Sequence, residues 1–184
     1  MKKVILDLAV TLDGFIEGSN GEIDWCIMDD DMKFDEFLNG VDTIFYGRVS
    51  YDAWGNFQPA VDAGESEKKF WKTIHDKKKY VFSGQENNDS RATFITSGIA
   101  QKVNDITQGH GGDIWLYGGA GLIKTFIDLG LIDVLRISVH PVVLGSGKPL
   151  FKDLKERINL KLLGSNVFRS GVVQLIYQKD GIID

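Results

Sequence analysis

Short apolar runs alternate with amphipathic stretches along most of the chain. Residues 4–10 are almost continuously apolar, which is typical of a strand that is covered on both faces. Similar runs predict further strands at 43–46, 79–82, 93–95, 113–117 and 134–139. Two late runs, at 160–163 and 172–177, predict a terminal antiparallel pair.

Between these runs, apolar residues recur at helical spacing. Helices are predicted after the acids at 29–31, after Ser66, from about 99 to 107, and from 122 to a C-terminal glycine at Gly130. Strands and helices in this order predict an α/β fold whose central sheet is mostly parallel and ends in a C-terminal antiparallel hairpin. In such sheets, ligands bind beyond the carboxyl ends of the strands.

Length, charge and cysteine content narrow the class of protein. We expect the 184 residues to form one domain, 1–184, because no internal repeat or linker divides them. A net charge of −5 argues against nucleic acid or an anionic membrane as the partner. The single Cys26 excludes an internal disulfide, and no apolar run is long enough to span a membrane. We therefore expect a soluble cytoplasmic protein that binds a small molecule.

Glycine is unusually frequent, at 21 residues, and three glycines surround Ala120 at 118–121. This run lies between a predicted strand and a predicted helix, where bare N–H groups and the helix dipole bind anions. It is therefore either a phosphate site or a tight turn. It is not a Rossmann motif, whose third glycine would fall at Lys124. Residues 145–148 are not a P-loop, because Val142 replaces the first glycine of that motif.

Two other predicted strand ends carry polar residues. Gly47 and Arg48 follow the strand at 43–46, and Ser50 lies two residues further on. The planar fork of an arginine can clamp a phosphate there, although a lone arginine is more often a surface residue. Ser83 ends the strand at 79–82, where its hydroxyl can reach a ribose.

Three acids at 29–31 lie between Trp25 and Phe34. Acids are ordinary at a helix N-terminus, but aromatic walls raise the pKa of a carboxyl group and let it donate a proton. Both interpretations stay open. The three histidines fall on different predicted elements, so no metal site is expected.

Three motifs carry a resemblance that extends over nearly the whole chain, strongest at both ends and weak from about 56 to 110. They are Leu-Asp-Gly at 12–14, Gly-Arg-x-Ser at 47–50, and a long block that begins at 118–123 and continues through 130–133 and 141–151. Together they resemble the dihydrofolate reductase-like superfamily, and most closely the C-terminal reductase domain of bacterial riboflavin-biosynthesis deaminase/reductases. The resemblance implies a three-layer α/β/α fold and a stand-alone reductase domain.

The resemblance also implies an NADPH site at three strand ends. Gly84 and Gln85 stand where related reductases often carry a basic residue for the 2′-phosphate, so a preference for NADPH over NADH would depend on Arg48, Ser83 and the lysines at 77–79. The nicotinamide would lie at Ala9, Thr11 and Gly14, the adenosine ribose at Ser83, and the phosphates at Gly47, Arg48, Ser50, Gly118, Gly119, Ala120, Gly121, Leu122 and Ile123.

Dihydrofolate reductases carry a tryptophan, an acid and a phenylalanine at a spacing that Trp25, Asp30 and Phe34 reproduce. By this resemblance Asp30 would bind or protonate a heterocyclic substrate between the two aromatic side chains. The neighbouring acids at 29 and 31 fit after a shift of one residue. Asp13 of the Leu-Asp-Gly motif is the rival catalytic group.

The resemblance therefore implies an NADPH-dependent reductase of a pteridine- or aminopyrimidine-like heterocycle. The nearest named activity is that of 5-amino-6-(5-phosphoribosylamino)uracil reductase in riboflavin biosynthesis. No obvious set of basic residues is available for the phosphoribosyl arm of that substrate, which favours a different heterocycle. The alternatives are dihydrofolate reductase activity and a nucleotide-binding protein without turnover. Relatives imply a homodimer, for which the late apolar strands can form the interface.

Overall fold

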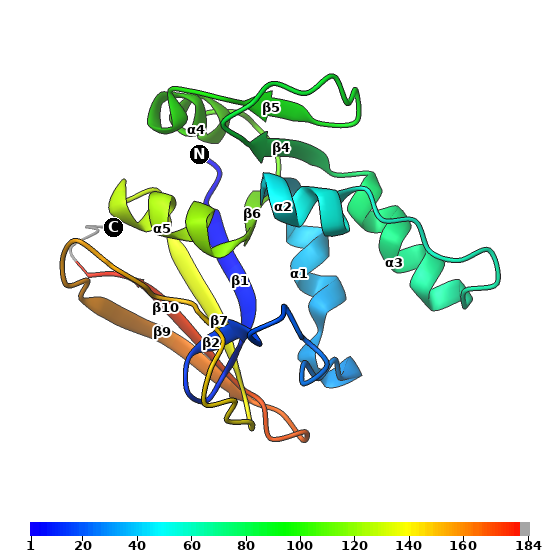
Figure 1. The fold of residues 1–184 in the computed structure, drawn as a ribbon, viewed down its shortest axis with the longest axis vertical. Helices are drawn as coiled ribbons and strands as arrows, with labels where there is room; N and C mark the ends of the chain where they lie inside the picture. Colours follow the sequence, from blue (N-terminus) through cyan, green and yellow to red (C-terminus); the bar gives the residue numbers. More distant parts are fainter. Residues whose placement is uncertain (181–184) are drawn as a thin grey trace.

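The computed structural model describes residues 1–180, apart from the side chain of Asp30. An eight-stranded sheet with the order β5-β4-β3-β6-β1-β7-β10-β9 forms its centre (Figure 1). The first six strands of this order are parallel, whereas β10 runs antiparallel to both β7 and β9. This confirms the predicted mostly parallel sheet with a C-terminal antiparallel hairpin. The bounds are β1 (Val4–Thr11), β3 (Val41–Gly47), β4 (Lys78–Phe82), β5 (Thr93–Ile95), β6 (Asp113–Gly118), β7 (Val134–His140), β9 (Leu160–Val167) and β10 (Val173–Lys179).

Helices cover both faces of this sheet, because its central strands are apolar on both faces. Phe45 of β3 packs in one core cluster with Val103 of α4 and Phe126 of α5. Its neighbour Ile44 points to the other face and packs in a second cluster, which includes residues of α1 and α3. The fold is therefore the predicted three-layer α/β/α arrangement. The helices are η1 (Asp30–Met32), α1 (Phe34–Gly40), α2 (Arg48–Ser50), η2 (Tyr51–Gly55), α3 (Glu65–His75), α4 (Ile99–Thr107) and α5 (Ala120–Asp128).

Several local features differ from the sequence prediction. The helix expected after 29–31 is divided in two, because Lys33 takes a left-handed conformation (φ 50°) between η1 and α1. The short helical segment from Arg48 to Gly55 was not predicted. Neither was a second, two-stranded sheet, in which β2 (Phe15–Glu17) pairs antiparallel with β8 (Lys148–Pro149). Within the described residues, no helix is long and apolar enough to cross a membrane.

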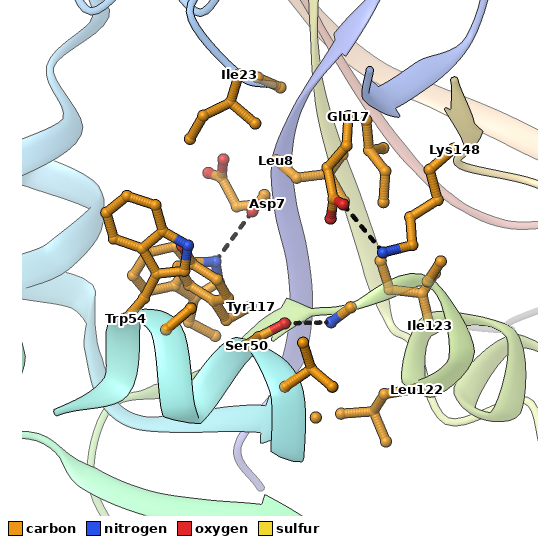
Figure 2. A pocket seen from close by; sticks show the side chains of 18 of the residues that line it. Asp7, Leu8, Glu17, Ile23, Ser50, Trp54, Tyr117, Leu122, Ile123 and Lys148 are labelled. Atoms are coloured by element: carbon orange, nitrogen blue, oxygen red, sulfur yellow. Dashed lines mark hydrogen bonds and ion pairs between the residues drawn. The ribbon is translucent and has the colours of Figure 1, made fainter. Parts of the chain in front are cut away.

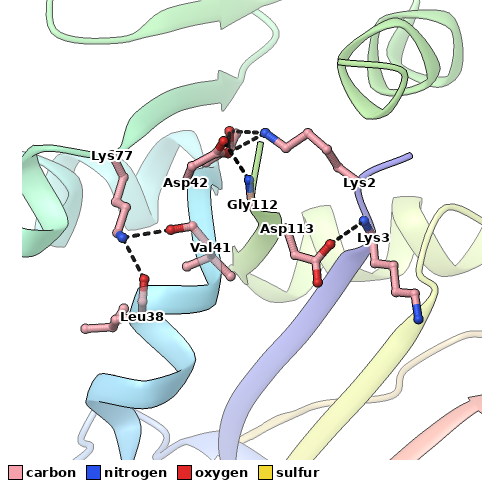
Figure 3. A network of polar contacts seen from close by, with 9 residues as sticks. Lys2, Lys3, Leu38, Val41, Asp42, Lys77, Gly112 and Asp113 are labelled. Atoms are coloured by element: carbon pink, nitrogen blue, oxygen red, sulfur yellow. Dashed lines mark hydrogen bonds and ion pairs between the residues drawn. The ribbon is translucent and has the colours of Figure 1, made fainter. Parts of the chain in front are cut away.

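Polar side chains tie the elements together at the amino ends of the strands (Figure 3). The Nζ of Lys2 is paired with the carboxylate of Asp42 and donates to Thr43 Oγ1 at 2.8 Å. Asp42 also accepts the backbone N–H of Gly112 at 3.0 Å. A Cβ on Gly112 would lie 2.7 Å from the carbonyl oxygen of Gly40, so only glycine fits this close approach.

The lysines at 77–79 also lie at these amino ends, which corrects one prediction. Lys77 Nζ donates to the carbonyl oxygens of Leu38 and Val41 at 2.6 and 2.7 Å, and Lys79 Nζ donates to that of His75 at 3.0 Å. Strand β4 separates these ammonium groups from its carboxyl end. They therefore support the ends of α1 and α3 and cannot select a 2′-phosphate near Ser83.

Candidate functional site

A cavity of about 950 Å³ opens at the carboxyl ends of the central strands (Figure 2). Its walls come from the ends of β1, β3, β4, β6 and β7 and from the starts of α2 and α5. This is the edge of a parallel sheet at which ligands bind, and the volume suits a large small-molecule ligand. The residues predicted from the sequence that line it are Ala9, Trp25, Phe34, Gly47, Arg48, Ser50, Ser83, Gly119, Ala120, Gly121, Leu122 and Ile123.

The glycine run forms the turn from β6 into α5. Gly118 has a φ of +108°, and its peptide bond to Gly119 is cis. The first helical hydrogen bond of α5 runs from the N–H of Ile123 to the carbonyl oxygen of Gly119 at 3.0 Å. The N–H groups at 120–122 therefore have no acceptor inside the helix, and these three residues line the cavity. A helix start of this kind fits a phosphate group.

A second helical segment begins beside this turn, directly after β3. The Oγ of Ser50 accepts a hydrogen bond from the N–H of Gly119 at 3.0 Å, as Figure 2 shows. Arg48 lies one turn before Asp52, and its Nη1 is 3.0 Å from the Oδ2 of that acid. The Arg48 side chain is half exposed and lines the cavity. The guanidinium of Arg48 thus lies at the edge of the sheet where an anion would bind. An anion there would have to compete with Asp52 for it.

The predicted site residues Thr11, Asp13 and Gly14 do not line the cavity. Thr11 and Asp13 form hydrogen bonds that connect the end of β1 to neighbouring loops. Thr11 Oγ1 donates to Asp13 Oδ1 at 2.6 Å and accepts the N–H of Phe15. Asp13 also accepts the N–H groups of Leu144 and Gly145. The hydrogen bond from Thr11 and the backbone bonds lower the pKa of Asp13. At neutral pH Asp13 is therefore an ionised acceptor and a poor proton donor.

The two aromatic residues of the predicted acid site do line the cavity. Trp25 contacts His140 edge-on, with ring centroids 5.4 Å apart, and Phe34 contacts Trp115 in the same way at 5.5 Å. The backbone of Asp30 belongs to η1, and its side chain lies outside the described part of the chain. The role of Asp30 therefore stays a prediction.

Asp31, the neighbour that fits after a shift of one residue, is engaged elsewhere. Its Oδ2 accepts the backbone N–H and the Nε–H of Arg169 at 3.3 and 3.4 Å. Asp31 is not among the residues that line the cavity. This acid connects η1 to the turn between β9 and β10.

Sequence reasoning missed an acid and a base inside the cavity. Asp7 of β1 is 7% exposed, and its Oδ2 lies 3.0 Å from the Nε of Arg136 on β7. Both residues line the cavity. Burial raises the pKa of Asp7 to about 6, although the charge of Arg136 opposes this effect. The signal in the sequence was a single acid inside an apolar strand, because an ionised side chain is costly there without a partner.

The cavity contains two more basic side chains besides Arg136. Lys148 Nζ is 3.0 Å from Glu17 Oε2 across the small sheet, as Figure 2 shows, and Arg48 pairs with Asp52. In the described part of the chain, each Lys or Arg that lines the cavity is thus paired with a carboxylate. The cavity is consequently poor in free positive charge.

Comparison with known proteins places this geometry in a family. Residues 2–174 match the family described as the RibD C-terminal domain. The chain is 59% identical over 181 residues to the uncharacterized protein YyaP of Bacillus subtilis (strain 168). The matched region covers 98% of this chain and 96% of YyaP.

Solved structures show the same fold at lower identity. A putative riboflavin biosynthesis protein from Shewanella sp. PV-4 is 22% identical with a TM-score of 0.76, over 98% of this chain and 99% of its own. A deaminase/5-amino-6-(5-phosphoribosylamino)uracil reductase from Thermotoga maritima is 17% identical with a TM-score of 0.68, over 97% of this chain and 56% of its own. Dihydrofolate reductase from Enterococcus faecalis, complexed with NADP(H), is 14% identical with a TM-score of 0.67, over 97% of this chain and 96% of its own.

The likeness to dihydrofolate reductase confirms the predicted fold, and the family match confirms the resemblance seen in the motifs. The chain belongs to the RibD C-terminal domain family.

Proposed function

We propose that the protein is an NADPH-dependent reductase that transfers hydride to a C=N or C=O bond of a pteridine- or aminopyrimidine-like heterocycle. The observation that carries this proposal is the turn from β6 into α5, where residues 120–122 have N–H groups without an acceptor inside the helix and line a cavity of about 950 Å³. Family membership supports the reductase class, and the Enterococcus faecalis dihydrofolate reductase binds NADP(H) on the same fold.

The residues present fit such a cofactor. The N–H groups at 120–122 are free to bind the pyrophosphate, and Arg48 is within reach of a further phosphate once it leaves Asp52. Ser83 would bind the adenosine ribose, and the small side chain of Ala9 leaves room for the nicotinamide ring. When bound, the cofactor supplies the hydride. The protein's contribution is position, exclusion of water by the aromatic wall, and a proton.

The pairing of the basic side chains bears on the substrate. Arg48, Arg136 and Lys148 each face a carboxylate, so a phosphoribosyl arm would have to break an existing ion pair in order to bind. We therefore propose a heterocycle without a phosphate as the substrate. 5-Amino-6-(5-phosphoribosylamino)uracil remains the nearest named substrate among the family's activities, and dihydrofolate is the alternative.

A turnover experiment tests this proposal. The protein is incubated with NADPH and one heterocycle at a time, and loss of the dihydronicotinamide absorbance is followed. The panel contains dihydrofolate, dihydropteridines, and aminopyrimidines with and without a phosphoribosyl group. We expect turnover of an unphosphorylated heterocycle. Tight NADPH binding without oxidation by any of them would favour the non-catalytic nucleotide-binding alternative.

We also propose that the chain forms a homodimer through β9. This strand lies at the edge of the sheet, and Leu160, Leu162, Leu163 and Val167 on it are exposed apolar residues. Apolar side chains on an open sheet edge are a liability for a monomer and typical of an interface.

A further inference from the structure

A row of polar side chains crosses the floor of the cavity, from β1 over β7 to β10. Asp7 pairs with Arg136, and Arg136 Nη2 donates to Gln174 Oε1 at 3.3 Å. Gln174 Nε2 in turn donates to Ser138 Oγ at 3.2 Å. These four residues line the cavity, and Asp7, Ser138 and Gln174 are buried. Burying such a row is costly unless its members pair with one another, so an atom of the row that lacks a partner needs an explanation.

Asp7, at one end of the row, has unused hydrogen-bonding capacity. Its Oδ2 and the Nε of Arg136 are 3.0 Å apart, but their alignment leaves both buried atoms without a hydrogen-bond partner. Buried polar atoms in native proteins nearly always have a partner, and exceptions cluster at functional sites. The carboxyl group of Asp7 is ion-paired with Arg136, yet it keeps hydrogen-bonding capacity for a ligand in the cavity.

The surroundings hold this carboxyl group in place. The indole Nε1 of Trp115 donates to the backbone oxygen of Asp7 at 3.0 Å, and the guanidinium carbon of Arg136 lies 4.6 Å from the ring centre of Phe37. Figure 2 shows the side chain of Asp7 pointing from β1 into the cavity. Besides Asp7 and Arg136, the titratable residues that line the cavity are Glu17 on β2, Cys26 in the loop after β2, Arg48 on α2, Tyr117 on β6, His140 on β7 and Lys148 on β8.

The position of Asp7 along β1 relates it to the proposed nicotinamide site. Residues two apart on a strand share a face and lie about 7 Å apart, so Asp7 and Ala9 face the same cavity. A substrate ring beside a nicotinamide held at Ala9 would lie near Asp7. Asp13 and Asp31 do not line the cavity. Asp13 accepts the N–H of Gly145, and Asp31 Oδ2 accepts the Nε–H of Arg169, which leaves Asp31 Oδ1 buried without a partner outside the cavity.

We propose that Asp7, oriented by Arg136, binds the substrate heterocycle through a ring nitrogen and donates the proton when that ring is reduced. This inference rests on the proposed function. In the step, a hydride from the dihydronicotinamide forms a C–H bond at carbon, and the proton of Asp7 forms an N–H bond at the adjacent nitrogen. The C=N π bond breaks, the cofactor is oxidised, and Asp7 is left as a carboxylate that faces the positive charge of Arg136 until solvent reprotonates it.

The environment of Asp7 suits this role. Burial raises its pKa to about 6, so that a useful fraction of the carboxyl groups carries a proton near neutral pH. The substrate class that follows is a planar heterocycle with a basic ring nitrogen beside an exocyclic amino group. Such an edge offers one acceptor and one donor, which match the two oxygens of a carboxyl group.

The test measures binding of two probes, NADPH and 2,4-diaminopteridine, by tryptophan fluorescence in the wild type and in Asp7→Asn. We expect Asp7→Asn to weaken diaminopteridine by about tenfold or more, because a charged hydrogen bond is lost, while NADPH affinity changes less than about twofold. The matched control is Asp133→Asn. Asp133 is a partly buried acid whose pKa is also raised, but it accepts the N–H of Val4 at the amino end of the sheet. It should leave both affinities unchanged.

The outcomes separate the two proposals. If the wild type binds no NADPH, the proposed function fails. If NADPH binds but diaminopteridine either does not bind or binds Asp7→Asn as tightly as the wild type, the role of Asp7 is overturned.

A second measurement covers the case in which Asp7→Asn does not fold. Carbon-13 NMR of aspartate carboxyl groups is recorded in the Asp133→Asn protein, which lacks the other aspartate that has a raised pKa among the described side chains. We expect one carboxyl to titrate near pH 6 and to shift when diaminopteridine is added. If the carboxyl signal that titrates near pH 6 does not shift when diaminopteridine is added, the proposal is overturned.

Discussion

The hydroxyl oxygen of Ser50 accepts a hydrogen bond from the backbone N–H of Gly119 at 3.0 Å. The two residues are 69 positions apart in the sequence: Gly119 directly follows β6, and Ser50 ends the short helix α2 that follows β3. Their contact connects the helical segment after β3 to the start of α5. The contact therefore sets the position of Arg48 relative to the N–H groups at the start of α5. We propose that Arg48 and these N–H groups bind the phosphates of the cofactor.

Removal of this contact tests whether it matters for binding. Ser50→Ala should weaken NADPH by about fivefold to tenfold, because a hydrogen bond of about 1 kcal/mol that positions the phosphate site is lost. Isothermal titration calorimetry measures the change. Ser66→Ala, on the exposed surface of α3, is the control and should bind NADPH as the wild type does. Equal affinities in the Ser50 and Ser66 variants would contradict this role.

Gly121 offers a test in which stability and binding move in opposite directions. A Cβ at Gly121 meets nothing within 4 Å, and alanine is the better helix former by up to about 1 kcal/mol. Gly121→Ala should therefore raise the melting temperature. The same methyl group would occupy the space in front of the free N–H groups, so NADPH affinity should fall by about tenfold or more. Gly164→Ala on β9, where a Cβ is equally unobstructed, should leave affinity unchanged. Unaltered NADPH binding in Gly121→Ala would contradict the proposal that a phosphate of the cofactor binds at this turn.

Arg48 is the basic residue expected to distinguish the two nicotinamide cofactors. Arg48→Gln should weaken NADPH by about 1.5–3 kcal/mol and NADH by clearly less, since only NADPH carries the 2′-phosphate. Asp52→Asn should strengthen NADPH modestly, because it frees the guanidinium from its ion pair. Competition titrations with both cofactors measure these changes, and Arg157→Gln is the surface control. Parallel losses for NADPH and NADH would place the 2′-phosphate elsewhere.

The pKa of Asp7 predicts a pH dependence of stability. This pKa is about 6 in the folded protein and 3.8 for a free aspartate, so the folded state binds the proton more tightly. The contribution of Asp7 to the free energy of unfolding, on the order of 3 kcal/mol, is therefore lost as pH rises from about 4 to about 6. Urea unfolding at a series of pH values should show that the wild type loses stability relative to Asp7→Asn over this range. Parallel curves would mean that Asp7 titrates normally.

The exposed apolar residues of β9 predict the oligomeric state. Leu162, 54% exposed on the edge strand, should lie in the interface of the proposed homodimer. Leu162→Glu should shift the protein to a monomer in sedimentation equilibrium without lowering its helix content. A wild type that is monomeric at high concentration would contradict the proposal.

Most of the fold could be predicted from periodicity, because the central strands are buried on both faces and the helices carry one apolar face. The glycine run at 118–121 also identified the strand–helix turn at the cavity correctly. The pairing of β2 with β8 could not be predicted, because both strands are very short and they lie about 130 residues apart in the sequence. Asp7 was missed for a related reason. A single acid in an apolar strand gives no sign of a partner in the sequence. Its partner, Arg136, is placed beside it only by the pairing of β1 with β7.

Energy transfer from tryptophan to a bound dihydronicotinamide tests the central claim most directly. Three of the four tryptophans, Trp25, Trp54 and Trp115, line the cavity. Excitation of tryptophan in the presence of NADPH should therefore quench protein emission and produce cofactor emission, both saturating together and both reversed by excess NADP⁺. Protein emission that stays constant up to millimolar NADPH, with no transferred emission, would contradict a nicotinamide dinucleotide site in this cavity.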